Sequence, residues 1–142
     1  MNPVTRKLYL GMCLALLPVF LLFASGCNQL RQEQIKLRDL EFTVLSEEVI
    51  PEELKSLIGE KQQEPFKFTY SDQDNLYICV GYGEQISGGY SIAVNELYLT
   101  DSSIYVSTEL LGPDISEKKN ASPSYPYVVI KTEYLEQTVI FE

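Results

Sequence analysis

The sequence predicts an α+β fold that is mainly β, with one N-terminal helix packed on a small antiparallel sheet or sandwich of five to six strands. Three observations lead to this prediction. One segment near residues 50–58 has helical apolar spacing, apolar residues alternate in most runs from residue 66 onward, and turn-forming residues separate these runs. A length of 142 residues fits one domain. A cleaved signal peptide is expected to precede it.

Residues 1–26 have the three parts of a secretory signal peptide. Two cations stand near the N-terminus, residues 8–24 are uncharged and apolar, and small residues precede Cys27. We therefore expect cleavage before Cys27 and acylation of its thiol. This lipid, a palmitate-type anchor, would hold the chain at the outer face of the bacterial cytoplasmic membrane, where stable attachment needs more than one acyl chain.

Two other interpretations of this segment stay open. The apolar stretch of 17 residues is slightly short for a membrane span of roughly 20, which leaves an uncleaved signal anchor as an alternative. Ala24 occupies the position where leucine is commonest in a lipoprotein signal, which leaves simple secretion. Pro18 lies inside the stretch and is unfavourable in a regular helix. Lipoprotein and anchor place the domain on the same side of the membrane.

The mature chain is strongly acidic. Without residues 1–26 it has nine Lys and Arg against 20 Asp and Glu, a net charge of −11. Phosphate binding requires clustered cations, so a nucleic-acid partner is not expected. The acidity is explained by solubility, by a cationic partner or by a divalent cation. The chain also contains no histidine, which excludes a Ser-His-Asp triad, a Cys-His pair and a histidine-bearing zinc site.

The elements are expected in a simple order. Residues 27–40 form a polar tether, partly helical, and residues 41–142 form the domain. Residues 42–45 read as a strand, and Pro51 opens a helix because its missing N–H is unpaired at that position anyway. The apolar stripe of this helix is Leu54, Leu57 and Ile58.

Alternating residues predict the remaining strands. They lie at 66–70, 76–82, 90–99, 104–110, 125–132 and 138–141. The apolar phase slips between Val94 and Leu97, which predicts a bulge near Asn95-Glu96. Asp101–Ser103 is expected to form a hairpin turn. Gly112-Pro113-Asp114 ends the following strand, and residues 115–124 form a polar loop.

No catalytic, cofactor or metal site is expected. Cys79 lies in an apolar strand pattern without a disulfide partner, which favours a small buried hydrophobe. Asp72–Asn75 resembles the start of a calcium loop but lacks its later ligands. The adjacent carboxylates Glu47/Glu48 and Glu52/Glu53 indicate a solvated face, because general acid–base chemistry needs carboxyls that converge across a cleft.

The segment Gly81–Tyr90 (GYGEQISGGY) is the candidate site. It has four glycines in ten residues between two predicted strands, and glycine is used where φ is positive or a backbone approaches closely. One interpretation is a connection adapted to a small sheet. The other is a loop presented to a protein partner, with tyrosines as anchors. Its candidate partner-binding residues are Tyr82, Gly83, Glu84, Gly88, Gly89 and Tyr90.

Several of these motifs resemble a known family. The run SGGYSI at residues 87–92, the break at Gly112-Pro113 and the run SYPYVVI at residues 124–130 are similar to the C-terminal domain of the protease-complex subunit PrcB. That family typically shows a T-G-G-Y-S-I-like motif, a Pro-Gly-rich break and a late T-x-P-Y strand. Here Ser87 replaces the usual threonine, and Asp114 stands where a cysteine often follows the break. The resemblance is expected to cover residues 41–142.

The resemblance implies a non-catalytic accessory lipoprotein that accompanies and stabilises a surface protease. We expect an envelope or secreted protein as the partner, with a protease among the candidates, and contact with the membrane through the lipid. A protease inhibitor that inserts Gly88–Tyr90 into a cleft is an alternative. A third is a small-ligand receptor or enzyme with a cleft of tyrosines and carboxylates near residues 81–90.

Overall fold

The computed structural model describes Pro3, residues 34–114 and residues 122–142. The predicted signal peptide and Cys27 lie outside these residues, as does most of the predicted loop at 115–124. Within the described residues, no helix has the length and apolar character needed to cross a bilayer.

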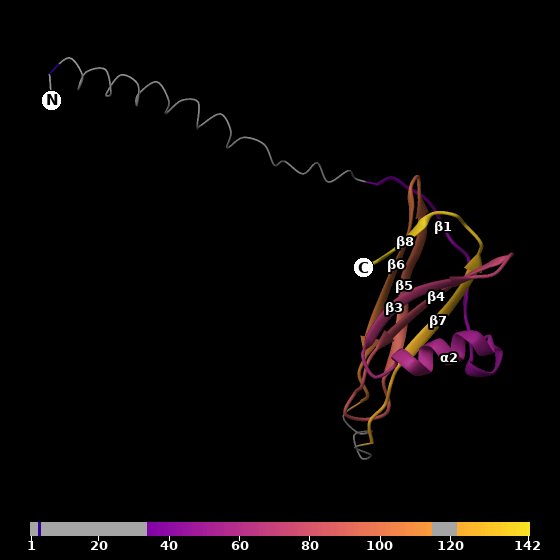
Figure 1. Cartoon of the computed structure of the whole chain (residues 1–142), viewed down its shortest axis with the longest axis vertical. Helices are drawn as coiled ribbons and strands as arrows, with labels where there is room; N and C mark the ends of the chain where they lie inside the picture. Colours follow the sequence, from indigo (N-terminus) through magenta and orange to yellow (C-terminus); the bar gives the residue numbers. More distant parts are fainter. Residues whose placement is uncertain (1–2, 4–33, 115–121) are drawn as a thin grey trace. The chain divides into compact units, whose positions relative to one another are not determined.

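The described part of the domain has eight strands, one α-helix and one 3₁₀ turn. In chain order they are β1 (Lys36–Asp39), β2 (Phe42–Val44), η1 (Glu47–Val49), α2 (Glu52–Lys61), β3 (Pro65–Ser71), β4 (Asn75–Tyr82), β5 (Ser91–Thr100), β6 (Ser103–Leu111), β7 (Tyr127–Glu133) and β8 (Thr138–Phe141) (Figure 1). The mainly β class and the single N-terminal helix are confirmed.

The strands form two four-stranded sheets, which is the sandwich of the two predicted alternatives, with eight strands in place of five to six. One sheet has the order β1-β5-β6-β8 and the other β2-β7-β4-β3. Every pairing is antiparallel except β6 with β8, which is parallel. The eight strands exceed the predicted five to six, and β1 is the strand that no predicted segment covers, because a short edge strand needs only a neighbour to pair with and carries little apolar alternation of its own.

The fold begins before the predicted boundary at residue 41. Residues 36–39, which we expected in a polar tether, form β1 and pair with β5. Leu40 is only 4% exposed, and its N–H donates to the carbonyl of Leu97. All four β1 residues are exposed, so the segment shows no apolar alternation from which the strand could be predicted.

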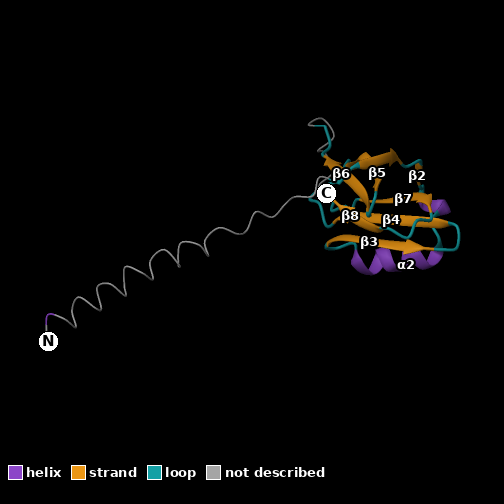
Figure 2. Ribbon diagram, turned by 90° about the horizontal axis from the view of Figure 1, so that it is seen from above, coloured by secondary structure: helices purple, strands orange, loops and turns teal. Residues whose placement is uncertain are grey.

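The main core lies between the two sheets. It is formed by Leu40, Leu76, Ile78, Val80, Leu97, Leu99, Ile104, Val106, Val128 and Ile130. A second cluster lies on the other face of β4 and β7, where Ile50, Leu54 and Ile58 pack against Tyr77, Cys79 and Val129. The result is three layers, with α2 outside the β3-β4-β7 sheet and the β5-β6 sheet on the opposite side (Figure 2).

Helix α2 confirms the predicted apolar stripe in part. Leu54 and Ile58 are buried against the sheet, whereas Leu57 is 36% exposed. Pro51 precedes the first helical residue, one position before the place we predicted for it. Because α2 packs on only one sheet, the buried arc of the helix is narrower than the predicted three-residue stripe.

Two local predictions in the other sheet are confirmed. The register of β5 against β6 shifts between Val94 and Glu96, which is the predicted bulge. The bulge keeps Val94 and Leu97 both turned toward the core. Asp101 and Ser102 form the turn between these strands, although β6 begins already at Ser103.

Cys79 is the buried hydrophobe that the sequence predicts. Its exposed fraction is 0%, and burial raises the pKa of its thiol to about 12. The thiolate is the nucleophilic form of cysteine. At neutral pH this side chain therefore acts as part of the packing beneath α2.

Candidate partner-binding site

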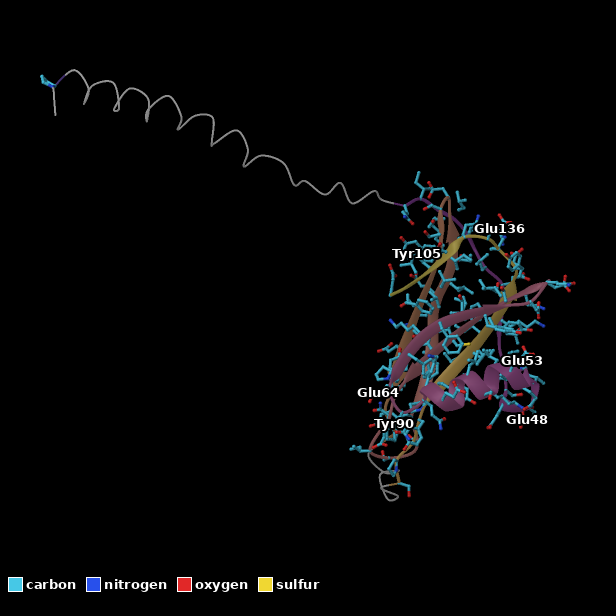
Figure 3. All side chains as sticks on the ribbon, in the orientation of Figure 1. Glu48, Glu53, Glu64, Tyr90, Tyr105 and Glu136 are labelled. Carbon is cyan, nitrogen blue, oxygen red and sulfur yellow. The ribbon has the colours of Figure 1, made fainter. Side chains whose placement is uncertain are left out.

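The segment Gly81–Tyr90 connects the two sheets. It leaves β4 in one sheet and enters β5 in the other. It lies at the end of the sandwich where Glu64 and Tyr90 are labelled, opposite the end that carries Glu136 (Figure 3). We call this ten-residue segment the crossover.

The first glycines of the crossover are required by packing. A Cβ on Gly81 would lie 2.2 Å from a ring carbon of Phe66. Gly83 has a φ of +70°, and a Cβ there would lie 2.9 Å from Pro65. Both positions therefore need glycine because the end of β4 lies close against the start of β3. For these two residues the interpretation as a structural connection is supported.

Tyr82 has an internal role. Its hydroxyl and that of Thr108 share a hydrogen bond of 2.9 Å, which joins β4 to β6 across the two sheets. Its ring packs against the inter-sheet core. The structure thus places this predicted anchor between the sheets, with its polar tip already paired.

The middle of the crossover is tied to the segment that precedes β7. Gln85 and Ser124 exchange two backbone hydrogen bonds of 2.8 and 3.1 Å. The hydroxyl of Ser124 donates to the carbonyl of Ser87 at 2.6 Å, and the side-chain amide of Gln85 (Nε2) donates to the backbone carbonyl of Tyr82 at 3.0 Å. Ser87 is 8% exposed. These contacts fix the backbone on both sides of residue 86.

An exposed polar pair lies beside this brace. The hydroxyl of Tyr125 donates to the carboxylate of Glu84 at 2.9 Å, and this bond raises the pKa of Tyr125. Glu84 was predicted as a candidate. Tyr125 was not, because it lies 41 residues further along the chain and only the pairing of the two segments brings them together.

The last part of the crossover is more open. A Cβ on Gly88 would meet nothing within 4 Å, and Gly89 has a φ of +84°. Tyr90 is half-buried beside Gly112. Of the two predicted tyrosine anchors, Tyr82 packs against the inter-sheet core, and Tyr90 is not among the side chains of that core.

The sequence-based prediction omitted Ile86. Its side chain is 83% exposed, the largest value among the large apolar side chains of the described residues. The signal was present in the sequence as one isoleucine among Gln, Ser and Gly. It fits no strand or helix period, and an apolar residue without a period is a candidate for exposure.

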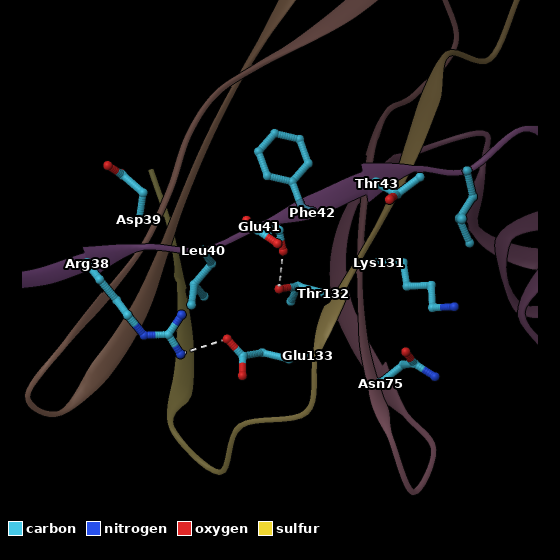
Figure 4. Close-up of a pocket in the computed structure, with 11 residues that line it drawn as sticks. Arg38, Asp39, Leu40, Glu41, Phe42, Thr43, Asn75, Lys131, Thr132 and Glu133 are labelled. Atoms are coloured by element: carbon cyan, nitrogen blue, oxygen red, sulfur yellow. Dashed lines mark hydrogen bonds and ion pairs between the residues drawn. The ribbon is translucent and has the colours of Figure 1, made fainter.

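Two hollows in the described residues lie outside the crossover. The larger, of about 990 Å³, surrounds the passage from β1 to β2 and is crossed by an ion pair of 2.6 Å between Arg38 and Glu133 (Figure 4). The smaller, of about 320 Å³, lies beside β2 and the start of β7. Neither is lined by residues 81–90, so a ligand cleft at the crossover has no support here. The described residues also contain no cluster of three or more Cys, Asp or Glu side chains placed to hold a metal ion.

The crossover lies within a segment that matches a known family. Residues 76–133 match the family model described as PrcB C-terminal. The resemblance predicted from SGGYSI and SYPYVVI is thereby confirmed for this segment. No curated protein and no solved structure showed a significant match.

The PrcB C-terminal match is shorter than the predicted 41–142 and has a clear structural meaning. It runs from β4 to β7 and therefore contains the two interior strands of each sheet, β4 and β7 in one and β5 and β6 in the other. The edge strands β1, β2, β3 and β8 and helix α2 lie outside it. The crossover and Ser124-Tyr125, which brace each other, both lie inside it.

Proposed function

We propose that this protein is a lipid-anchored, extracytoplasmic accessory protein that binds another envelope or secreted protein and catalyses no reaction itself. A surface protease is the first candidate for the partner. The observation that carries the proposal is the PrcB C-terminal match over residues 76–133, which includes the braced crossover. The resemblance implies association with a protease complex.

The form of the crossover supports binding. Its backbone is hydrogen-bonded to Ser124 on both sides of residue 86, so little conformational freedom would be lost when a partner docks. It exposes Ile86 and the Glu84 carboxylate, and the Tyr125 hydroxyl lies beside them. These groups suit a contact surface with an apolar centre and a polar border.

A crosslinking pull-down from the native membrane tests the proposal. The lipidated wild-type chain and its Tyr90→Ala variant serve as baits, and mass spectrometry identifies the proteins recovered. A single dominant protease or envelope protein with the wild-type bait supports the accessory function. Recovery of nothing above background with the wild-type bait contradicts it. Equal recovery with both baits removes Tyr90 from the contact.

The lipid anchor has its own test. Replacement Cys27→Ser removes the thiol that would be acylated. We expect the wild-type chain to incorporate labelled palmitate and the variant to incorporate none. A wild-type chain that incorporates no label would contradict the lipid anchor and favour the uncleaved signal anchor or simple secretion.

A protease-inhibitor function is the second candidate. A braced connection with a protruding side chain is a form that enters a cleft, and inhibitor contacts bury about 800 Å² on each partner. Purified protein assayed against the extracellular proteases of its host tests this candidate. Absence of inhibition across that set rejects it and leaves the accessory function in place.

A further inference from the structure

We infer that Ile86 is the anchor of the partner contact and that it enters an apolar pocket bordered by Lys or Arg side chains on a protein partner. This inference rests on the proposed function and deepens it. It replaces the predicted tyrosine anchors with a residue that the sequence patterns did not single out.

The exposure of Ile86 is the first argument. The side chain is 83% exposed, and complete burial of an isoleucine contributes about 1.5–3 kcal/mol relative to exposure. Single exposed apolar residues are common on protein surfaces. What distinguishes Ile86 is the support beneath it.

That support is the second argument. Gln85, on one side, exchanges two backbone hydrogen bonds with Ser124. Ser87, on the other side, is buried and accepts a 2.6 Å hydrogen bond from the Ser124 hydroxyl. The isoleucine therefore projects from a fixed backbone, which is the arrangement that lowers the entropic cost of docking.

The residues after Ser87 leave room for a partner. Gly88 and Gly89 are exposed and carry no side chain, and the space around Gly88 is open to 4 Å. A facing surface can approach this backbone closely while Ile86 projects into it. This close approach of the two surfaces around Ile86 suits an anchor side chain that fills a pocket at the centre of a contact.

Charge defines the border of the pocket. Exposed carboxylates surround this end of the sandwich: Glu84 is in the crossover, Glu64 lies where Gly83 packs, and Asp114 follows the glycine beside Tyr90. Two cations, Lys61 in the last turn of α2 and Lys67 in β3, each lie three residues from Glu64 in the chain. Among these described residues the carboxylates outnumber the cations by three to two, and opposite charge on a partner improves both encounter rate and specificity.

Site-specific photo-crosslinking in the full chain on its native membrane tests the inference. A diazirine analogue of leucine is placed at position 86 and, as the control, at position 140. Ile140 is also an exposed apolar residue, but it lies in β8 and not in the crossover. We expect position 86 alone to crosslink one partner protein, at an apolar segment flanked by Lys or Arg.

Matched substitutions give the second measurement. Ile86→Asp is expected to lower capture of that partner by about tenfold or more, whereas Ile86→Val retains most of it. Glu64→Lys is expected to weaken capture most at low salt, because the attraction between exposed charges is screened as salt rises. None of these exposed positions should shift the melting temperature, which controls for folding.

The outcomes separate this inference from the proposed function. A partner that crosslinks from position 140 and not from 86, or that Ile86→Asp captures undiminished, overturns the anchor while the accessory function stands. A crosslink from position 86 that returns only to this chain or to a second copy also overturns it. If no bait, wild type included, captures a partner, the proposed function fails and the inference fails with it.

Discussion

The connections before and after strand β4 are stabilised in different ways. At its start, Asp72–Asn75 turns the chain from β3 into β4 within the same sheet. At its end, the crossover carries the chain into the other sheet. The first connection is held mainly by hydrogen bonds among residues 72–77, and the second depends on residues far along the chain.

The hairpin turn at Asp72–Asn75 is held mainly by local contacts, and one distant residue adds to them, since the N–H of Tyr134 donates to the Asp74 carbonyl at 3.0 Å. One carboxylate oxygen of Asp72 accepts hydrogen bonds from the N–H groups of Asp74 and Asn75 at 2.9 and 2.7 Å, and the other accepts from the Tyr77 hydroxyl at 3.0 Å. This is an Asx-type turn, in which a side chain replaces backbone partners. The carboxylate that resembled a calcium ligand is thus used to hold the turn.

The crossover is held by hydrogen bonds to residues that lie far along the chain. Its brace comes from Ser124 and Tyr125, which follow Ser87 and Glu84 by 37 and 41 residues. It continues the pairing of β4 with β7 within one sheet, and it leaves Ile86 outside. A turn held mainly by local hydrogen bonds stabilises one hairpin. A connection held by residues distant in the chain can keep a side chain in a fixed exposed position.

The largest expected effect concerns the crossover glycines. Gly83→Ala places a Cβ against the Pro65 backbone at a φ of +70°, and we expect it to lower the free energy of unfolding by about 1–3 kcal/mol. Gly88→Ala, in open space, is the control and should change it by no more than about 0.5 kcal/mol. Urea denaturation measures both. Equal losses would show that the two halves of the crossover are not different.

The next effect concerns the bond between the sheets. Tyr82→Phe removes the hydrogen bond to Thr108, at an expected cost of about 0.5–1.5 kcal/mol of unfolding free energy. A double-mutant cycle with Thr108→Val isolates the coupling. Tyr90→Phe is the control, since the Tyr90 hydroxyl makes no hydrogen bond with the described residues. A cycle without coupling would mean that Tyr82 acts only through its ring.

A smaller effect concerns the hairpin and depends on pH. The two backbone N–H donors lower the pKa of Asp72 from its usual value. A carboxyl with a lowered folded pKa stabilises the fold above its unfolded pKa of about 3.9, and this contribution disappears as pH falls through the folded value. Asp72→Asn should therefore be less stable than wild type at neutral pH, with the difference shrinking below about pH 4. Thermal melts across pH measure it, and a difference independent of pH would contradict the expectation.

The smallest effect is an absence of reaction. Cys79 is fully buried with a pKa of about 12, so iodoacetamide at pH 8 should leave it unmodified in the native protein and modify it in urea. Ile86→Cys gives the contrast, because a thiol at that exposed position should react without denaturant. Peptide mass spectrometry separates the two sites. Native labelling of Cys79 would show that the α2 layer opens.

Local patterns predicted most of this fold. Alternation located β3 to β8 within a few residues, the helical stripe located α2, and the phase slip at Val94 located the bulge. The strand that these patterns missed was β1, because its side chains are exposed and polar. An edge strand of that kind is specified by its hydrogen-bonding neighbour, which only the folded chain supplies.

For the candidate site, the sequence by itself determined the place and the backbone: four glycines between two strands, of which Gly81 and Gly83 have steric reasons to be glycine. Tertiary structure decided which side chains remain available. Tyr82 lies inward because Thr108 is within reach of its hydroxyl, and Ile86 lies outward because Ser124 holds the backbone on both sides of it. These partners are 26 and 38 residues away in the chain, and no local pattern encodes a contact at that separation.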